Sequence, residues 1–463
     1  MATTHTQPKT TTASRAQIEI APNPSFIDEN VSIRVGGVAP GARVTLRAEA
    51  SDEAAAGARD GLHDGVGEKT GRIWEARGAY VADAAGCVNV ASHESLGGTY
   101  RGCDAMGLFW SMKLEAAAHG GRATFRKDRP AADTVALTAE IDGRVIATCR
   151  LDRRWLAPGT QIRDIGEDAN GEGVAGRLFI PPGREPHAVV IVLGGSGGGY
   201  DLDKAAVLAR HGFATLSLAY FGLPGLPTWL HRVPLEYFAR TLAWLGRQPE
   251  TDARRMGVLG VSRGAELALL LSSTFPEIRA VAAYAPSAVA WGSGGRDKAT
   301  GEIIPCWTRG GEAVPFAPLP LRGFMARSAV PVGLLRRPVK FRNLFRAALR
   351  NRDAIARAQI PVEQTHGPIL LISGGDDHVW PASRMAEMIC ARLRARNFSH
   401  SVEHLHYPKA GHELRYPFLP TTARTTRPAG FKFAISFGGT AEADAEAQRD
   451  AWRRARAFFH NSL

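Results

Sequence analysis

The 463-residue sequence predicts two folds in succession: an all-β sandwich, then a doubly wound and mostly parallel sheet covered by helices. Up to about residue 160, short runs of alternating apolar and polar residues are separated by glycine, proline and aspartate, as in antiparallel sandwiches. After about residue 174, nearly continuous apolar runs alternate with helical stretches, as in parallel sheets buried on both faces.

Composition limits the classes of protein to which this chain can belong. Hydrophobic residues make up 44% and charged residues 22%, as in ordinary soluble globular proteins. No apolar run reaches the ~18–20 residues of a membrane span, so we expect none. Five scattered cysteines without a C-x-x-C pair predict free thiols in a reducing compartment, no structural zinc or other metal, and a cytoplasmic location. They are Cys87, Cys103, Cys149, Cys306 and Cys390.

The net charge of +12 can indicate a nucleic acid, a membrane surface or an anionic small substrate as partner. No nucleic-acid-binding motif accompanies the charge, and aromatic residues are not interleaved with the basic clusters as in single-strand binders, so we expect no nucleic-acid partner. A polyphosphate substrate would suit the charge, and a solvated basic surface would suit it equally well. The sequence does not indicate an oligomeric state.

Residues 1–15 are rich in threonine and lack an apolar core, which predicts a disordered tail rather than a secretion signal. Residues 16–165 predict the β-sandwich. Within it, residues 96–112 are too rich in glycine and aromatic residues for a plain strand. They form either a loop that fills the core, which we favour, or a loop that presents residues to the next domain. The runs assigned to strands are Val31–Val35, Val44–Ala48, Val135–Ala139 and Val145–Thr148.

Residues 166–173 have the composition of a linker, and residues 174–463 predict the second domain. Six apolar runs there predict strands, with helices between several of them, for example at 203–211 and 235–245. In such sheets the reactive groups gather at the carboxyl ends of the strands. A segment rich in proline and tryptophan, at about 287–366, predicts a lid-like insertion. The six runs are Ala188–Leu193, Ala214–Leu218, Met256–Leu259, Ala280–Tyr284, Ile369–Ser373 and Val402–Tyr407.

The most informative stretch is Gly260-Val-Ser-Arg-Gly264, which lies between an apolar run and a helix-forming run. A G-x-S-x-G pattern in this context is typical of a nucleophile elbow, where a sharp turn lifts the serine hydroxyl clear of its neighbours. The two glycines leave room for the close approach of strand and helix. The alternative is a glycine-rich turn whose serine only caps the helix. We interpret Ser262 as a nucleophile.

A serine nucleophile needs a base, and the base needs an orienting acid. On a doubly wound sheet with such an elbow the chain order is serine, acid, histidine. Asp377 and His412 each follow a predicted strand, on the edge that holds Ser262, so we predict that these three residues form a catalytic triad. Asp376 is interpreted as hydrogen-bonding the turn. The nearby histidines are assigned to packing, to solvent or to the border of the pocket: His378, His404 and His406.

An acyl-transfer site of this kind also needs two hydrogen-bond donors for the oxyanion. We predict that the backbone N–H of Arg263 is one of them. The second donor should come from the glycine-rich loop 194–199, where we favour Gly195 or Ser196. The alternative for this loop is a phosphate cradle, but it lacks the Gly-Lys-Ser/Thr ending of a P-loop and its glycine spacing fits a dinucleotide site poorly.

In residues 336–352, apolar side chains recur at helical spacing and basic side chains take most of the other positions. This pattern is typical of an ordinary amphipathic helix with a solvated basic face. The functional alternative is a lid or binding wall that faces an anionic substrate, in which Arg342 and Arg346 contact the substrate.

Several blocks together resemble the family of acyl-CoA thioesterases and bile acid-CoA:amino acid N-acyltransferases, over nearly the whole chain after residue 16. The elbow alone is common to many hydrolases, whereas the methionine–tryptophan block ahead of it is much more specific. The blocks are Leu96-Gly-Gly-Thr-Tyr100 with Met106-Gly-Leu-Phe-Trp-Ser-Met112, Gly212-Phe-Ala-Thr-Leu-Ser-Leu-Ala-Tyr220, Val233-Pro-Leu-Glu-Tyr-Phe238, Gly260-Val-Ser-Arg-Gly-Ala-Glu266, Asp376-Asp-His-Val-Trp380 and Ala410-Gly-His412.

The resemblance implies an immunoglobulin-like sandwich followed by an α/β-hydrolase domain with the triad Ser262, Asp377 and His412. It also implies an acyl-CoA or related thioester as substrate, with coenzyme A as part of that substrate and no separate cofactor. In this family the conjugating enzymes look cysteine-based and the thioesterases serine-based, so the serine favours hydrolysis. The glycine-rich stretch near Ala50–Gly71 and the basic segment 336–352 depart from the family pattern and leave the acyl chain and carrier open. The alternatives are acyl transfer to an amine, carboxylester hydrolysis, and a binding or scaffold protein with a decayed site.

Overall fold

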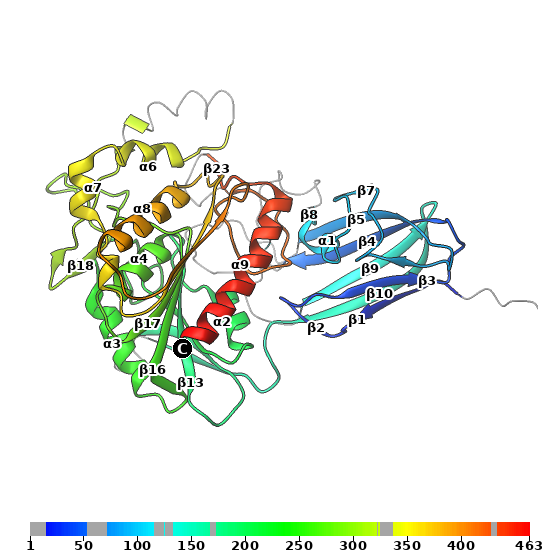
Figure 1. The fold of residues 1–463 in the computed structure, drawn as a ribbon, viewed down its shortest axis with the longest axis horizontal. Coiled ribbons are helices and arrows are strands. Elements are labelled where there is room, and N and C mark those ends of the chain that lie inside the picture. Colours follow the sequence, from blue (N-terminus) through cyan, green and yellow to red (C-terminus); the bar gives the residue numbers. More distant parts are fainter. Residues whose placement is uncertain are drawn as a thin grey trace, which may run out of the picture.

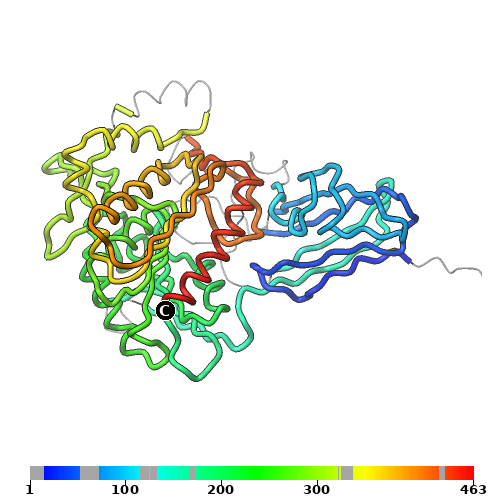
Figure 2. The backbone as a smooth tube through the Cα atoms, viewed as in Figure 1, coloured from blue at the N-terminus to red at the C-terminus, as the bar shows by residue number. Residues whose placement is uncertain are grey.

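The computed structural model describes residues 15–52, 72–114, 125, 133–166, 173–321, 323–324, 337–426 and 433–463. Apart from Arg15, the predicted tail lies outside the described residues, as do residues 167–172 of the predicted linker and most of 50–71. Figure 1 and the tube in Figure 2 show two bodies: a sandwich built from the first part of the chain and a larger body of strands and helices built from the rest.

The first body is a sandwich of two sheets that share an apolar core. One sheet has the order β1-β3-β6, and the other has the order β2-β10-β9-β4-β5-β7 with β8 also paired to β5. In β4, Val44, Leu46 and Ala48 are buried and alternate with partly exposed residues, which is the two-residue period of a strand with one face on the core. All four predicted strand runs are therefore confirmed. The elements are β1 (Gln17–Ala21), β2 (Ser25–Phe26), β3 (Ser32–Gly36), β4 (Arg43–Asp52), β5 (Arg72–Val81), β6 (Val88–Asn89), β7 (Gly97–Gly98), α1 (Gly107–Trp110), β8 (Lys113–Leu114), β9 (Asp133–Ile141) and β10 (Arg144–Arg154).

The second body is built on an eight-stranded sheet with the order β11-β12-β14-β13-β16-β17-β20-β21. The strands from β14 to β21 run parallel, whereas β11 and β12 are antiparallel to their neighbours. All six apolar runs predicted as strands are confirmed, in the mostly parallel arrangement that was expected. The strands are β11 (Gln161–Ile165), β12 (Ala175–Ile180), β13 (His187–Leu193), β14 (Ala214–Ala219), β16 (Thr251–Val261), β17 (Ile278–Tyr284), β20 (Ile369–Gly374) and β21 (Val402–Tyr407).

One boundary needs correction. Residues 161–165, which the sequence pattern assigned to the sandwich, form β11 and pair with β12 at the edge of the large sheet. The alternation of side chains shows that a segment is a strand with one exposed face, but it does not show which sheet the strand joins.

Helices cover both faces of the large sheet. α3, α4 and α8 belong to the apolar cluster on one face, and α2 and α9 belong to the cluster on the other face, which continues into the sandwich core. In Figure 1, α9 (red) lies between the large sheet and the sandwich. None of the described helices combines the length and the apolar character that a membrane crossing requires. The helices are α2 (Leu202–Ala209), α3 (Leu235–Gly246), α4 (Arg263–Ser272), α6 (Arg342–Ala348), α7 (Arg352–Ala358), η1 (Val362–Gln364), α8 (Ala382–Ala395) and α9 (Ala441–Ser462).

The predicted insertion leaves the sheet after β17 and returns at β20, and it carries α6, α7 and short strands. One of these strands, β18, pairs with β15, which lies directly before α3. The insertion is thus attached to the body at a point far from it in sequence. The short strands of this body are β15 (Val233–Pro234), β18 (Trp307–Arg309), β19 (Glu312–Ala313), β22 (Thr425–Thr426) and β23 (Ile435–Ser436).

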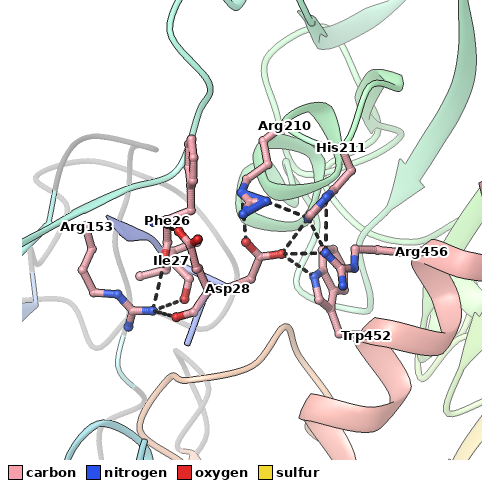
Figure 3. A network of polar contacts seen from close by, with 9 residues as sticks. Phe26, Ile27, Asp28, Arg153, Arg210, His211, Trp452 and Arg456 are labelled. Carbon is pink, nitrogen blue, oxygen red and sulfur yellow. Dashed lines mark hydrogen bonds and ion pairs between the residues drawn. The ribbon is translucent and has the colours of Figure 1, made fainter. Parts of the chain in front are cut away.

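The sandwich contacts the second body through a buried polar network around Asp28, shown in Figure 3. Asp28 Oδ2 lies 2.7 Å from His211 Nε2 at the end of α2 and accepts a 2.8 Å hydrogen bond from Trp452 Nε1 of α9, while Oδ1 lies 3.1 Å from Arg210 Nε. Burial alone would raise the pKa of Asp28, but the hydrogen bond with His211 and the charge of Arg210 outweigh it and lower the pKa.

The methionine–tryptophan block of the sandwich serves both of the roles considered for it. Trp110 and Met112 are buried in the core, as the packing interpretation predicted. Their carbonyl oxygens also accept hydrogen bonds across the domain contact, from Thr421 N–H at 3.0 Å and from Thr422 Oγ1 at 2.5 Å.

Candidate active site at the carboxyl edge of the large sheet

Ser262 lies in a sharp turn between the end of β16 and the start of α4. Its φ of +57° is in the left-handed region, which is unfavourable for a residue other than glycine and indicates a backbone held under strain. The N–H of Ser262 donates a 2.9 Å hydrogen bond to the carbonyl oxygen of Tyr284 in the neighbouring strand β17. The turn therefore has the geometry of a nucleophile elbow.

The two glycines that flank the serine are required because there is no room for a side chain at either position. A Cβ atom at Gly260 would lie 2.0 Å from the carbonyl oxygen of Gly264, and a Cβ atom at Gly264 would lie 2.3 Å from the carbonyl oxygen of Leu193. Both distances are far shorter than a van der Waals contact. Strand, helix and glycine loop approach so closely here that neither position accepts a side chain.

Asp377 and His412 form a buried pair on the same edge of the sheet. Asp377 follows β20 and is 1% exposed, and His412 follows β21 and is 5% exposed. Oδ2 of the carboxylate lies 2.7 Å from Nδ1 of the imidazole, and Oδ1 accepts hydrogen bonds from the backbone N–H groups of Val379 and Trp380. Among the described residues, neither His412 Nε2 nor Ser262 Oγ has a hydrogen-bond partner. Nε2 is thus the nitrogen left for a reacting proton.

The pKa of His412 is set by opposing effects. Burial alone would lower it, but the charge of Asp377 and the hydrogen bond to it outweigh burial, so the pKa is raised above the ordinary 6.5 of an imidazole. An imidazolium at this position is therefore stabilised, as a general base requires once it has accepted a proton.

The loops that carry Asp377 and His412 are held together by a segment that the sequence did not single out, residues 435–439. The carbonyl oxygen of Phe437 accepts a 2.9 Å hydrogen bond from His412 N–H, and the phenyl ring stacks on the imidazole with ring centroids 6.4 Å apart. The pair Gly438-Gly439, both at positive φ, was the available sequence signal of a tight approach.

Asp444, in the first turns of α9, also supports this loop. Its carboxylate accepts a 2.7 Å hydrogen bond from the N–H of Gly411, the residue before His412. Burial raises the pKa of Asp444 to about 7.

The neighbours of the pair take supporting positions. Asp376 accepts hydrogen bonds from His378 Nε2 at 3.0 Å and from the N–H of Gly439 at 3.1 Å, so its side chain braces the turn, as the sequence suggested. His404 Nε2 lies 2.8 Å from Ser373 Oγ, and His406 is exposed. None of these histidines contacts the Asp377 carboxylate.

The glycine-rich loop passes beside the serine. A Cβ atom at Gly195 would lie 3.4 Å from Ser262 Cβ and 3.9 Å from Ser262 Oγ, so the backbone at Gly195 borders the nucleophile, whereas the side chain of Ser196 is exposed. Tyr220 fixes this loop, because its hydroxyl donates a 2.6 Å hydrogen bond to the carbonyl oxygen of Gly194.

The N–H of Arg263 is the first of α4 and, as at helix N-termini generally, no described group accepts a hydrogen bond from it. Both predicted sources of oxyanion donors therefore adjoin Ser262: Arg263 follows it in the chain, and the loop at Gly195 passes beside it.

The side chain of Arg263 forms a buried ion pair that was not predicted. Its Nη1 lies 2.8 Å from Oε2 of Glu266, which is fully buried one turn further along α4. Oε1 of Glu266 accepts hydrogen bonds from Trp307 Nε1 at 2.9 Å and from the N–H of Trp291 at 3.2 Å. Burial raises the pKa of Glu266. The Arg263–Glu266 pair thus connects α4, the helix that follows the nucleophile, to Trp291 and Trp307 of the insertion.

The two arginines predicted to contact substrate lie on α6, next to the loop that carries Asp377, which we call the acid loop. Arg342 is mostly buried and its Nη1 lies 3.5 Å from Asp376 Oδ1, whereas Arg346 is exposed. They lie beside the Asp377–His412 pair rather than in contact with it.

Comparison with known proteins agrees with this architecture. Residues 28–167 match the family described as "Acyl-CoA thioester hydrolase/BAAT N-terminal region", and residues 233–463 match "BAAT / Acyl-CoA thioester hydrolase C terminal". Mouse mitochondrial acyl-coenzyme A thioesterase 2 is 31% identical over 98% of this chain and 91% of its own length. Human acyl-coenzyme A thioesterase 1 is 30% identical over 94% of each chain, and mouse peroxisomal succinyl-coenzyme A thioesterase is 29% identical over 94% of each.

Among solved structures, a dienelactone hydrolase from Anabaena variabilis covers 66% of this chain and 99% of its own, with a TM-score of 0.34 and 17% identity. An esterase from Pyrobaculum calidifontis covers 65% of this chain and 84% of its own, with a TM-score of 0.38 and 15% identity.

Proposed function

Because the chain belongs to the acyl-CoA thioester hydrolase/BAAT family, we propose that it is a serine-dependent thioesterase that hydrolyses an acyl-CoA to the free acid and coenzyme A. The observation that carries the proposal is the 2.7 Å pairing of Asp377 with His412 on the sheet edge that holds the strained Ser262. Such a pairing leaves Nε2 of the imidazole as the base for a serine hydroxyl.

In the first half of the proposed reaction, His412 Nε2 accepts the proton of Ser262 while Oγ attacks the thioester carbonyl carbon. The Arg263 N–H and the loop at Gly195 donate hydrogen bonds to the developing oxyanion. Asp377 holds Nδ1 protonated and stabilises the imidazolium. The tetrahedral intermediate then collapses, the carbon–sulfur bond breaks, and the imidazolium protonates the leaving thiolate.

In the second half, His412 takes a proton from water, which attacks the acyl-serine ester. The ester bond breaks, the acid is released and Ser262 regains its proton. The proposed steps use only groups of this chain, the substrate and water. We propose that no separate cofactor takes part.

Replacing the nucleophile tests the assignment. Ser262→Ala should lower kcat/KM for a good acyl-CoA by at least about a thousandfold, because the remaining groups cannot form an acyl-enzyme. Release of the free thiol measures turnover, and a fluorophosphonate probe should label the wild-type protein but not this variant. Ser401→Ala, at an exposed position before β21, is the matched control and should keep wild-type turnover. Turnover by Ser262→Ala at the wild-type rate would refute the proposal.

Two related activities, acyl transfer to an amine and carboxylester hydrolysis, are separated from thioester hydrolysis by two further measurements. The family description covers enzymes of both kinds, so an amine such as glycine or taurine could replace water in the second half-reaction. Mass spectrometry of the products with amino acids present separates an amide from a free acid. Comparison of thioester and oxyester substrates separates the proposed activity from that of a carboxylester hydrolase.

A cytoplasmic location is part of the proposal, on the basis of the cysteine pattern in the sequence. Cell fractionation is the test, because the relatives include proteins named as mitochondrial and as peroxisomal.

A further inference from the structure

Two helices begin next to the loop that carries Asp377. Arg342, the first residue of α6, donates its backbone N–H to the carbonyl oxygen of His378 at 2.9 Å. Near the start of α8, Ser383 Oγ donates to the carbonyl oxygen of Gly374 at 3.0 Å. Figure 1 shows α6 and α8 as neighbours on the side of the body where β23 lies. The first turns of both helices are therefore fixed to the stem of the acid loop.

Four cations lie on these two helices or directly before α6, and we call them the α6–α8 basic cluster: Lys340, Arg342, Arg346 and Arg384. Arg342 begins α6, Arg346 is in its last turn, and Arg384 is near the start of α8. Neither helix has an acidic residue in its first turn. Among the described residues, the only carboxylate within ion-pair distance of any of the four is Asp376, at 3.5 Å from Arg342. Burial lowers the pKa of Arg346, and so do the positive charges of Arg342 and Arg384.

The four side chains of the cluster differ in how exposed they are and in whether they already form an ion pair. The Arg342 side chain is 17% exposed and is held by Asp376, whereas Lys340, Arg346 and Arg384 are exposed, and no described residue forms an ion pair with them. Positive charge at the start of a helix such as α8 is unfavourable, because the helix dipole places partial positive charge there. An anion bound between Arg346 and Arg384 would relieve both sources of repulsion.

We propose that the α6–α8 basic cluster binds the phosphate groups of the coenzyme A part of the substrate, a proposal that rests on the thioesterase function proposed above. Guanidinium groups match phosphate oxygens in geometry, and several of them together suit a ligand with several phosphates. The cluster adjoins the acid loop without touching the Asp377–His412 pair. This separation fits a substrate in which the uncharged pantetheine arm lies between the phosphates and the reacting carbonyl.

The test compares two thioesters of the same acyl group, one on coenzyme A and one on N-acetylcysteamine, which lacks the phosphates. The double variant Arg346→Gln/Arg384→Gln removes the two exposed guanidinium groups. The ratio of kcat/KM for acyl-CoA to kcat/KM for the N-acetylcysteamine thioester should fall about tenfold at low salt, as expected for two phosphate contacts in partial solvent. The fall should shrink as salt screens the charges. Arg394→Gln, at the exposed far end of α8, removes one exposed guanidinium group from the same helix and should keep the wild-type ratio.

Every outcome decides the proposal. An equal loss with both thioesters in the double variant would show that the arginines maintain the fold, and an unchanged ratio would show that they do not contact the phosphates; either result overturns the proposal. A loss of equal size in Arg394→Gln would indicate a general effect of net charge and would also overturn it. If the wild-type protein hydrolyses the N-acetylcysteamine thioester but not acyl-CoA, the proposed function itself fails, and the phosphate site fails with it.

Discussion

His412 is buried, yet its pKa is raised, because the Asp377 carboxylate more than offsets the cost of burying the charge. A general base works only when it is neutral, so activity should be lost as the pH falls through this raised pKa. We expect kcat/KM to rise with pH to a plateau, with its midpoint above 6.5, the ordinary value for an imidazole.

Asp377→Asn should lower that midpoint and reduce kcat by roughly 10⁴-fold, since an amide neither stabilises the imidazolium nor holds the correct tautomer. The measurement is the pH dependence of kcat/KM for both proteins with one acyl-CoA. A wild-type midpoint below 6.5, or a variant with the wild-type profile, would contradict the role given to Asp377.

At this scale the sequence was informative where a motif constrains the backbone. Ser262 could be singled out because Gly260 and Gly264 are forced by the close approach of strand and helix. Phe437 and Asp444 could not, because they support His412 through one carbonyl oxygen and one carboxylate contributed from distant parts of the chain. The glycine pair 438–439 is a local signal of a tight approach, but no local pattern shows that this approach is made to the loop of His412.

Between elements, the Arg263–Glu266 pair connects α4 to the insertion. Glu266→Gln should leave the buried guanidinium without a counter-charge, and removing one partner of a buried pair costs ~3–5 kcal/mol of unfolding free energy. The double replacement Arg263→Met/Glu266→Leu removes both charges and should cost less than the single change. Urea unfolding measures both.

Glu446→Gln, on the exposed side of α9, is the matched control for Glu266→Gln and should unfold like the wild type. If the double variant is less stable than Glu266→Gln, the ion pair itself contributes more to stability than burying one unpaired charge costs.

Element prediction from the sequence was most successful for the parallel strands. Five of the six apolar runs are buried on both faces, so their composition alone identifies them, whereas the sixth, Val402–Tyr407, lies at the sheet edge and is only partly buried. It was least successful at the edge, where β11 was assigned to the wrong sheet, and at the seven-residue helix α7, which was not predicted. The amphipathic pattern in 336–352 is confirmed by α6, which buries Leu344, Phe345 and Ala348. Short helices and edge strands are determined by contacts with their neighbours more than by their own pattern.

For the whole molecule, the two predicted folds and their order are confirmed, whereas the contact between them could not be anticipated. Asp28 is isolated in the sequence, and its partners lie far along the chain: residues 210 and 211 directly after α2, and residue 452 on α9. Asp28→Asn should leave the surrounding cations unpaired and lower the unfolding free energy by ~3–5 kcal/mol. Asp142→Asn, in the exposed β9–β10 turn at positive φ, should be neutral because asparagine accepts that backbone conformation.

Chemical unfolding followed by tryptophan fluorescence checks this expectation, since most of the nine tryptophans, including Trp452 in this network, are buried and report on unfolding. If Asp28→Asn unfolds at the same denaturant concentration as Asp142→Asn, the network does not stabilise the contact between the two bodies.

α9 follows every other described element along the chain, yet it supplies Trp452 to the joint and Asp444 to the amide beside His412. A polypeptide leaves the ribosome from its N-terminus, so the sandwich and the sheet emerge from the exit tunnel before this helix does. A nascent chain without α9 therefore has the strands of both bodies, but it lacks the helix that covers part of one face of the large sheet, the carboxylate that binds the Gly411 amide and the indole that binds Asp28. The histidine loop and the contact between the two bodies are therefore completed only after the strands of both bodies have been synthesised.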